Sequence, residues 1–382
     1  MPSTFLHRPL AAALAALALA ATTGCGGGGG AGEPQPAAAA PPAAAAASAA
    51  PRLFVVGDSL ADVGTFGLKA TVQNAADRAS GYPVFPELVA NELGAARPCN
   101  FFASSDGRAF TTRGGCTGFA VGGALIRNPV TRGGSAVPFS IEHQLERAVA
   151  AAGGGWRAGD LVLVDGGGND AAALAEAFLD ARDGGAADDA VFAALLAQEL
   201  DASALARALA QADGRSTAAG LYMERLAQTF WSRVKAHTLD RGARRVALVD
   251  IPDLTLMPRF RTRDAALRAA LRQWIVRFNT ELARLAAGDP RVVLVPYFDD
   301  VTAHSANPAR FGLTNASDPA CPQAADFPAD CTDAALDAAP PAGFSRGWWR
   351  TWAWSDEFHP SPRGHELLAA TVLRALAAAG WR

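Results

Sequence analysis

The segment LFVVGDSL, residues 53–60, joins four apolar residues to a small polar turn. A short apolar run that stops at glycine and aspartate predicts a buried strand, Leu53–Val56, followed by a loop. A strand that is apolar on both faces is typical of a parallel sheet covered by helices on each side. Ser59 stands in the loop, directly after the predicted strand.

Three further apolar runs resemble the first, at Leu161–Val164, Arg245–Ile251 and Arg291–Val295. Helical patterns separate the runs, and they cover Ile141–Ala152, Ala171–Asp183, Ala190–Ala212, Thr217–Leu239, Asp264–Ala287 and Gly364–Ala378. Short strands that alternate with long helices predict parallel strands joined by crossover helices. We therefore expect an α/β fold, a three-layer α/β/α sandwich around a central, mainly parallel, flavodoxin-like sheet.

The composition is that of a globular protein, because 50% of the 382 residues are hydrophobic and 19% are charged. Lys and Arg number 34 against 37 Asp and Glu, which gives a net charge of −3. A chain without an excess of basic residues has no general attraction for nucleic acid, so we expect no nucleic-acid partner.

Residues 1–25 have the pattern of a bacterial export signal. Their apolar stretch, Pro9–Ala21, is shorter than the ~20 residues that a membrane-spanning helix needs. It is followed by TTGC at 22–25, which resembles a lipobox and predicts lipidation of Cys25. Cleavage at Ala20 or Ala21 by ordinary signal peptidase is the alternative, and it would leave a freely secreted protein. Either route predicts an exported protein.

Residues 26–51 are rich first in glycine and then in alanine and proline, with Glu33 as their one charged residue. Such a composition cannot form a packed core, so it predicts a flexible tether. Residues 52–382 remain for a single folded domain.

Four cysteines remain after Cys25: Cys99, Cys116, Cys321 and Cys331. An even number of cysteines in an exported protein indicates two disulfides, for which three connectivities are possible. We prefer the two local pairings, Cys99–Cys116 and Cys321–Cys331, because each closes a short loop. No zinc-binding pattern such as CxxC or HExxH occurs, and we expect no metal.

Four short blocks carry side chains suited to catalysis: GDSL at 57–60, GFAVGGA at 118–124, GND at 168–170 and SDEFHP at 355–360. Ser59 is a candidate nucleophile, although a serine after a strand also serves to cap a helix. The glycines of the second block let a backbone N–H approach a ligand, and Asn169 offers an amide donor. Asp356 and His359 are presented by one loop near the end of the chain.

In this order the blocks resemble those of the GDSL or SGNH hydrolase superfamily, and the resemblance covers residues 52–382. The resemblance implies an SGNH-like fold and hydrolysis of carboxylic esters, as an esterase or lipase, through an acyl-enzyme. It implies that Ser59 is the nucleophile, that His359 is the base and that Asp356 holds the histidine. No cofactor is implied.

The resemblance also implies an oxyanion hole built from Ser59, Gly123 and Asn169. Gly123, and not Gly122, matches the family's glycine, because it stands five positions after Gly118. Gly118 departs from the family pattern, which usually has asparagine there.

The partner that the resemblance implies is an ester substrate, either a lipid or an acylated sugar. The membrane enters only through the lipid anchor at Cys25. Two alternatives remain open: an acyltransferase or carbohydrate deacetylase that uses the same site, and a non-catalytic surface lipoprotein. All four blocks are intact, which disfavours the second alternative.

Three other features need an interpretation. GFSRG at 343–347 matches the GxSxG pattern, but prolines precede it and too little chain follows for the remaining catalytic residues, so we take Ser345 as a decoy. Four tryptophans, at 348, 349, 352 and 354, either pack the late loop or line a substrate pocket. His365 opens the last helix and is expected either at the surface or as a capping residue.

Overall fold

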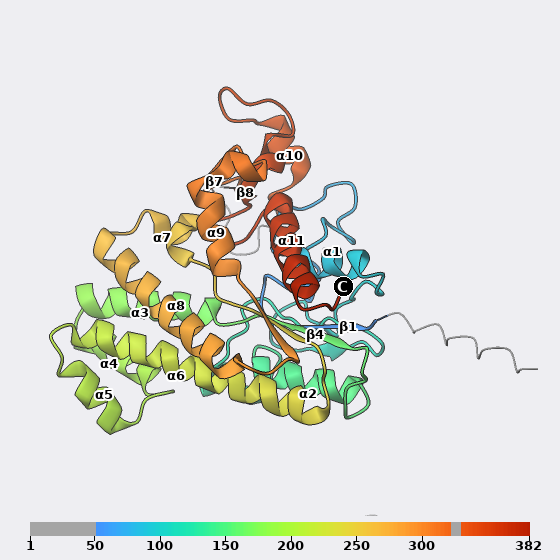
Figure 1. Ribbon diagram of the computed structural model, residues 1–382. Helices are drawn as coiled ribbons and strands as arrows, with labels where there is room; N and C mark the ends of the chain where they lie inside the picture. Colours follow the sequence, from blue (N-terminus) through green and yellow to red (C-terminus); the bar gives the residue numbers. More distant parts are fainter. Residues whose placement is uncertain (1–50, 322–329) are drawn as a thin grey trace, which may run out of the picture. The chain divides into compact units, whose positions relative to one another are not determined.

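In the computed structural model, which describes residues 51–321 and 330–382, the four apolar runs form one parallel sheet (Figure 1). Its strands run in the order β1 (Leu53–Val56), β4 (Leu161–Val164), β5 (Val246–Val249) and β6 (Val292–Val295). The first three are buried along their whole length, whereas β6 is partly exposed at the edge. The predicted parallel sheet is confirmed.

Residues 117–121 extend this sheet beyond β1 without forming a regular strand. The Val55 N–H donates to the Thr117 carbonyl at 2.9 Å, and the Phe119 N–H donates back to Val55 at 2.7 Å. Further along, the Val121 N–H donates to the Gly57 carbonyl at 3.1 Å. The second sequence block therefore runs beside the first and reaches the carboxyl end of β1 with it.

Helices cover both faces of the sheet, with α11 and α1 on one side and α2 and α6 on the other (Figure 1). The helices are α1 (Phe85–Glu92), α2 (Ile141–Ala151), α3 (Gly168–Asp183), α4 (Ala186–Leu196), α5 (Ala202–Leu209), α6 (Gly214–His237), α7 (Pro258–Arg261), α8 (Ala265–Ala286), α9 (Tyr297–Ala306), α10 (Asp333–Ala338) and α11 (Pro362–Ala378). Short 3₁₀ turns occupy Val130–Arg132, Gly134–Ala136, Leu239–Arg241, Leu254–Leu256, Pro308–Phe311 and Trp348–Thr351. The expected α/β/α sandwich is confirmed.

One predicted helix is wrong in its extent. The pattern over 190–212 is broken into α4 and α5, because the chain leaves the helix after Leu196 and Asp201 starts a new one. The Asp201 carboxylate accepts the Ala204 N–H at 2.8 Å, which is the usual cap at a helix start. Apolar periodicity continues through the break, so it does not reveal the cap.

Two pairs of short strands complete the secondary structure. β2 (Phe102–Ala103) and β3 (Thr111–Thr112) pair antiparallel, and β7 (Asn315–Pro319) and β8 (Trp352–Trp354) pair parallel. Disulfides join Cys99 to Cys116 and Cys321 to Cys331, with Cα–Cα distances of 4.9 and 5.9 Å. These are the two local pairings preferred from the sequence. The first closes the loop that carries the β2–β3 hairpin.

The four late tryptophans, Trp348, Trp349, Trp352 and Trp354, are all buried. Three of them donate their indole N–H to Leu336, Asp337 and Ala316 on neighbouring segments. They therefore pack the late loop against the rest of the domain, which is the first of the two interpretations of these residues.

The export signal, Cys25 and residues 26–50 of the tether lie outside the described residues. No helix within the described residues is long and apolar enough to cross a membrane.

Candidate active site

Ser59, His359 and Asp356 form one chain of hydrogen bonds, although 300 positions separate the serine from the histidine. The Ser59 Oγ lies 2.8 Å from the His359 Nε2, and the His359 Nδ1 lies 2.8 Å from the Asp356 Oδ2. All three side chains are buried. This geometry lets the imidazole accept the serine proton at one nitrogen while the carboxylate holds the other.

The loop before α11 presents the aspartate and the histidine together. The Asp356 Oδ1 accepts the backbone N–H groups of Phe358, at 2.8 Å, and His359, at 2.6 Å. Ser361 then caps α11 by accepting the Gly364 N–H at 3.1 Å. The aspartate therefore shapes the turn with one oxygen and orients the imidazole with the other.

Backbone donors for an oxyanion are available at Ser59 and Gly123. Within the described residues, neither N–H has a hydrogen-bond partner, whereas the Gly122 N–H donates to the Asp62 Oδ2 at 2.8 Å. Gly123 has a φ of +77°, a backbone conformation that other residues rarely adopt. The Gly123 N–H, and not the Gly122 N–H, is therefore available to a ligand.

The third predicted donor, Asn169, lies at the start of α3, beside the same loop. Its Nδ2 donates to the Ala124 carbonyl at 3.0 Å, which leaves the second amide hydrogen for a ligand. The structure therefore brings together Ser59, Gly123 and Asn169, the three predicted members of the oxyanion hole, from the loops after β1, after residues 117–121 and after β4.

The presence of glycine at position 118, where the family pattern usually has asparagine, has a physical reason. A Cβ at this position would lie 2.9 Å from the Val63 Cγ2 and 3.0 Å from the Cys99 carbonyl oxygen. The Gly118 N–H also donates to that carbonyl at 2.9 Å. The disulfide-closed loop thus approaches this backbone too closely for an asparagine side chain.

Buried carboxyl groups surround the carboxyl ends of β1, β4 and β5. Burial raises the pKa of Asp170 to about 6 and that of Asp250 to about 7, although each accepts backbone N–H groups that lower it. Burial also raises the pKa of Asp165 well above its ordinary value, and the neighbouring Asp58 carboxyl adds to the rise. Sequence reasoning passed over these residues, although Asp58 and Asp170 belong to the blocks that it identified.

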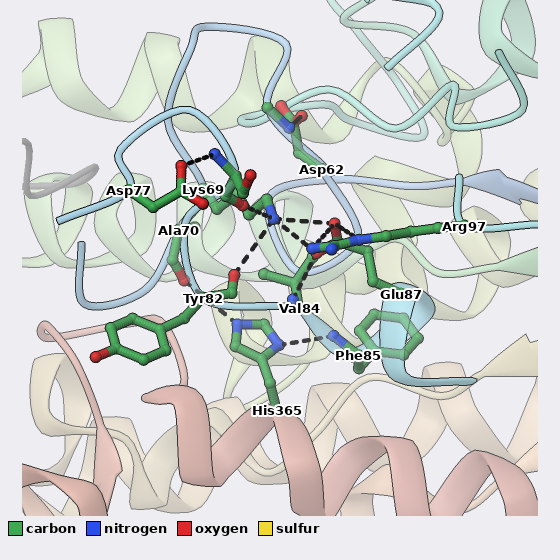
Figure 2. Close-up of polar contacts among 12 residues, drawn as sticks. Asp62, Lys69, Ala70, Asp77, Tyr82, Val84, Phe85, Glu87, Arg97 and His365 are labelled. Carbon is green, nitrogen blue, oxygen red and sulfur yellow. Dashed lines mark hydrogen bonds and ion pairs between the residues drawn. The ribbon is translucent and has the colours of Figure 1, made fainter. Parts of the chain in front are cut away.

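Figure 2 shows the polar contacts that fasten the loop after the first block. The Lys69 Nζ bonds to both carboxylate oxygens of Glu87, at 2.9 and 2.8 Å, and Arg97 bonds to the same carboxylate. His365 lies beneath them, fully buried between the Phe85 N–H at 3.3 Å and the Ala70 carbonyl at 3.4 Å.

The expectation that His365 lies at the surface is therefore wrong. Burial lowers its pKa to about 3, so this histidine is neutral at physiological pH. Helical periodicity could not reveal this, because the two segments that cover His365, at Ala70 and at the start of α1, are distant in sequence.

Ser345, the decoy serine, lies in an exposed segment between α10 and the 3₁₀ turn at 348–351, and no strand leads into it. Within the described residues, one group of three side chains could ligate a metal, namely Glu142, Glu146 and His237. Those residues belong to α2 and α6, and Glu142 already pairs with Arg233 at 2.7 Å. This group is separate from the catalytic residues.

Two similar solved structures are phospholipase A1 from Streptomyces albidoflavus NA297, with a TM-score of 0.37, and an extracellular lipase from Streptomyces rimosus, with a TM-score of 0.39. Each is 14% identical in sequence, and each alignment covers 85% of this chain and 99% of the other. No curated protein matches the chain.

The family comparison covers most of the chain. The family model described as GDSL-like lipase/acylhydrolase matches residues 53–372, a span that contains all four sequence blocks. The match extends from the first strand of the sheet into α11. The chain therefore belongs to the GDSL-like lipase/acylhydrolase family, and hydrolysis of esters is the activity that this membership supports.

Proposed function

We propose that the chain hydrolyses carboxylic esters through an acyl-enzyme on Ser59. The observation that supports this most strongly is the hydrogen-bonded chain from the Ser59 Oγ through His359 to Asp356. A serine hydroxyl is a weak nucleophile until a base takes its proton, and the His359 Nε2 is within reach of that proton.

In the acylation half, the Ser59 Oγ attacks the ester carbonyl carbon while its proton moves to the His359 Nε2. The carbonyl oxygen becomes an oxyanion that the N–H groups of Ser59 and Gly123 and the Asn169 amide stabilise. Asp356 stabilises the imidazolium through Nδ1. The carbon–oxygen bond to the alcohol then breaks, and the alcohol leaves with the proton from His359.

In the deacylation half, water attacks the acyl carbon and gives its proton to His359. The second tetrahedral intermediate uses the same donors, and its collapse frees the carboxylic acid and returns the proton to Ser59. No step calls on a metal or a cofactor.

The test uses the exported protein and 4-nitrophenyl esters of graded acyl length. We expect Ser59→Ala to lose activity by at least ~10³-fold without a change in melting temperature, because only the nucleophile is removed. Ser345→Ala is the matched control, and it should keep wild-type activity. Full activity in Ser59→Ala, or loss of activity only in Ser345→Ala, would contradict the assignment. The preferred chain length would also define the substrate.

We further propose that the protein is exported and that Cys25 becomes its lipid-modified N-terminus. Support comes from the short apolar stretch, the small residues before Cys25 and the tether after it. Partitioning in Triton X-114 tests this, because a lipid anchor carries the protein into the detergent phase. We expect the wild type in the detergent phase and Cys25→Ser in the aqueous phase; both in the aqueous phase would indicate simple secretion.

A further inference from the structure

The oxyanion loop, defined here as residues 122–127, belongs to no helix or regular strand. It nevertheless carries the Gly123 N–H, which must meet a developing oxyanion at hydrogen-bond distance. An irregular segment keeps such a position only if its backbone groups are held from outside. The partners of its N–H groups therefore determine how well the oxyanion hole is preorganised.

Asp62 holds the first residue of the oxyanion loop. Its Oδ2 accepts the Gly122 N–H at 2.8 Å, and its Oδ1 accepts Gly64 and Thr65 at 2.9 and 2.7 Å. Asp62 stands three positions after Ser59, so one fully buried carboxylate joins the chain just beyond the nucleophile to the residue before Gly123.

Asp170 holds the far end of the oxyanion loop. Its Oδ2 accepts the Ile126 N–H at 3.0 Å, and its Oδ1 accepts the Arg127 N–H at 3.2 Å. Its neighbour Asn169 reaches the middle of the same loop through the Ala124 carbonyl. The first turn of α3 therefore carries Asn169, a predicted oxyanion donor. It also carries Asp170, which anchors the loop that contains the donor Gly123.

We propose that Asp62 and Asp170 are positioning residues of the oxyanion hole, which hold Gly123 against Ser59 and Asn169 by binding the loop on either side of it. The proposal rests on the proposed function, since it concerns the same oxyanion. Neither residue touches the substrate, and each acts through the backbone of the oxyanion loop.

The lack of a Lys or Arg partner for either carboxyl group, within the described residues, indicates that backbone N–H groups are their main partners. Within the described residues, neither carboxylate pairs with a Lys or Arg side chain. The buried Lys69, which follows Asp62 in the loop after the first block, bonds to Glu87 instead, and Figure 2 shows Asp62 apart from that ion pair. A buried carboxylate without a counter-ion is costly, so its N–H donors are what keep it in place.

Replacement by asparagine isolates this role, because it keeps the size of the side chain and changes one acceptor into a donor. In Asp62→Asn, an amide N–H would face either the Gly122 N–H or those of Gly64 and Thr65. In Asp170→Asn, one of two backbone donors would lose its acceptor. Either change loosens the oxyanion loop without removing any group that binds the oxyanion.

The experiment compares these two variants of the full chain with the wild type on 4-nitrophenyl butyrate. We expect kcat to fall by about 10- to 100-fold, less than the ~10²–10³ that removal of a donor costs, while KM changes little. The inhibition constant of an aryl trifluoromethyl ketone should rise by a similar factor, because its adduct with Ser59 places an oxyanion in the hole.

Asp160→Asn is the control. Asp160 is also a buried acceptor of a backbone N–H, from Arg157 at 2.8 Å, but it precedes β4 at the opposite end of the sheet and, unlike Asp62 and Asp170, pairs with an arginine, Arg52, at 2.7 Å. The Asp160→Asn substitution should lower the melting temperature and leave kcat and the inhibition constant unchanged.

Wild-type kcat and inhibition in folded Asp62→Asn and Asp170→Asn would overturn the proposal, as would an equal loss of kcat in Asp160→Asn. If one variant does not fold, the other decides. Failure of the proposed function has a different signature, since Ser59→Ala would then keep the wild-type activity.

Discussion

The Asp165 carboxyl, directly after β4, has neither oxygen bonded to a donor group in the described part of the chain. Burial raises its pKa well above the ordinary value, and the Asp58 carboxyl beside it adds like-charge repulsion. Two buried carboxyls this close favour a state in which they share one proton. In the unfolded chain Asp165 titrates normally, so folding retains a proton that the unfolded state releases.

We therefore expect wild-type stability to fall as the pH rises from about 4 toward the raised pKa, because the folded state binds more protons than the unfolded state. Asp165→Asn keeps a neutral side chain at every pH and removes this loss. The difference in melting temperature, variant minus wild type, should increase between about pH 5 and about pH 8. A difference that is constant over this range would show that Asp165 ionises normally in the folded protein.

Among the elements, α11 connects helix capping to catalysis. Ser361 caps it by accepting the Gly364 N–H, and its hydroxyl also donates to the Trp352 carbonyl. Because His359 lies only two residues before this cap, we expect Ser361→Ala to reduce both stability, by about 1 kcal/mol, and kcat. Urea unfolding and ester hydrolysis measure the two effects.

Asp201→Ala supplies the comparison at α5, where the aspartate accepts the Ala204 N–H at 2.8 Å. That helix carries none of the predicted catalytic residues, so the stability loss should be similar, about 1 kcal/mol, and kcat should not change. An equal effect on kcat in both variants would mean that capping of α11 does not position His359.

For the whole molecule, the sheet, both helical layers and all predicted catalytic residues lie within residues 52–382. We expect a chain that starts at Arg52, exported behind an unrelated signal, to keep the wild-type kcat and melting temperature. Starting at Leu53 should cost about 1–3 kcal/mol, because the buried Asp160 would lose two bonds from Arg52, at 2.8 and 2.7 Å. Denaturant unfolding compares the two; a loss of stability on starting at Arg52 would place part of the fold before it.

Local sequence patterns were enough to predict the four sheet strands, most helices and the four blocks. Strands β1 and β4 have the bounds expected from their apolar runs. This works because a buried strand is apolar along its length and stops at a turn, which is information within a few neighbouring residues. The catalytic roles predicted for Ser59, Asp356 and His359 come from the resemblance of their blocks, and of the order of those blocks, to the GDSL or SGNH hydrolase superfamily.

Other features depend on contacts between distant segments, and only the tertiary structure decided them. The Gly122 and Gly123 N–H groups differ because Asp62, from another loop, bonds to the first and not the second. His365 is buried because the loop at Ala70 and the start of α1 close over it. The physical reason is the same for both: burial and hydrogen-bond partners belong to pairs of segments, and a local pattern describes only one member of each pair.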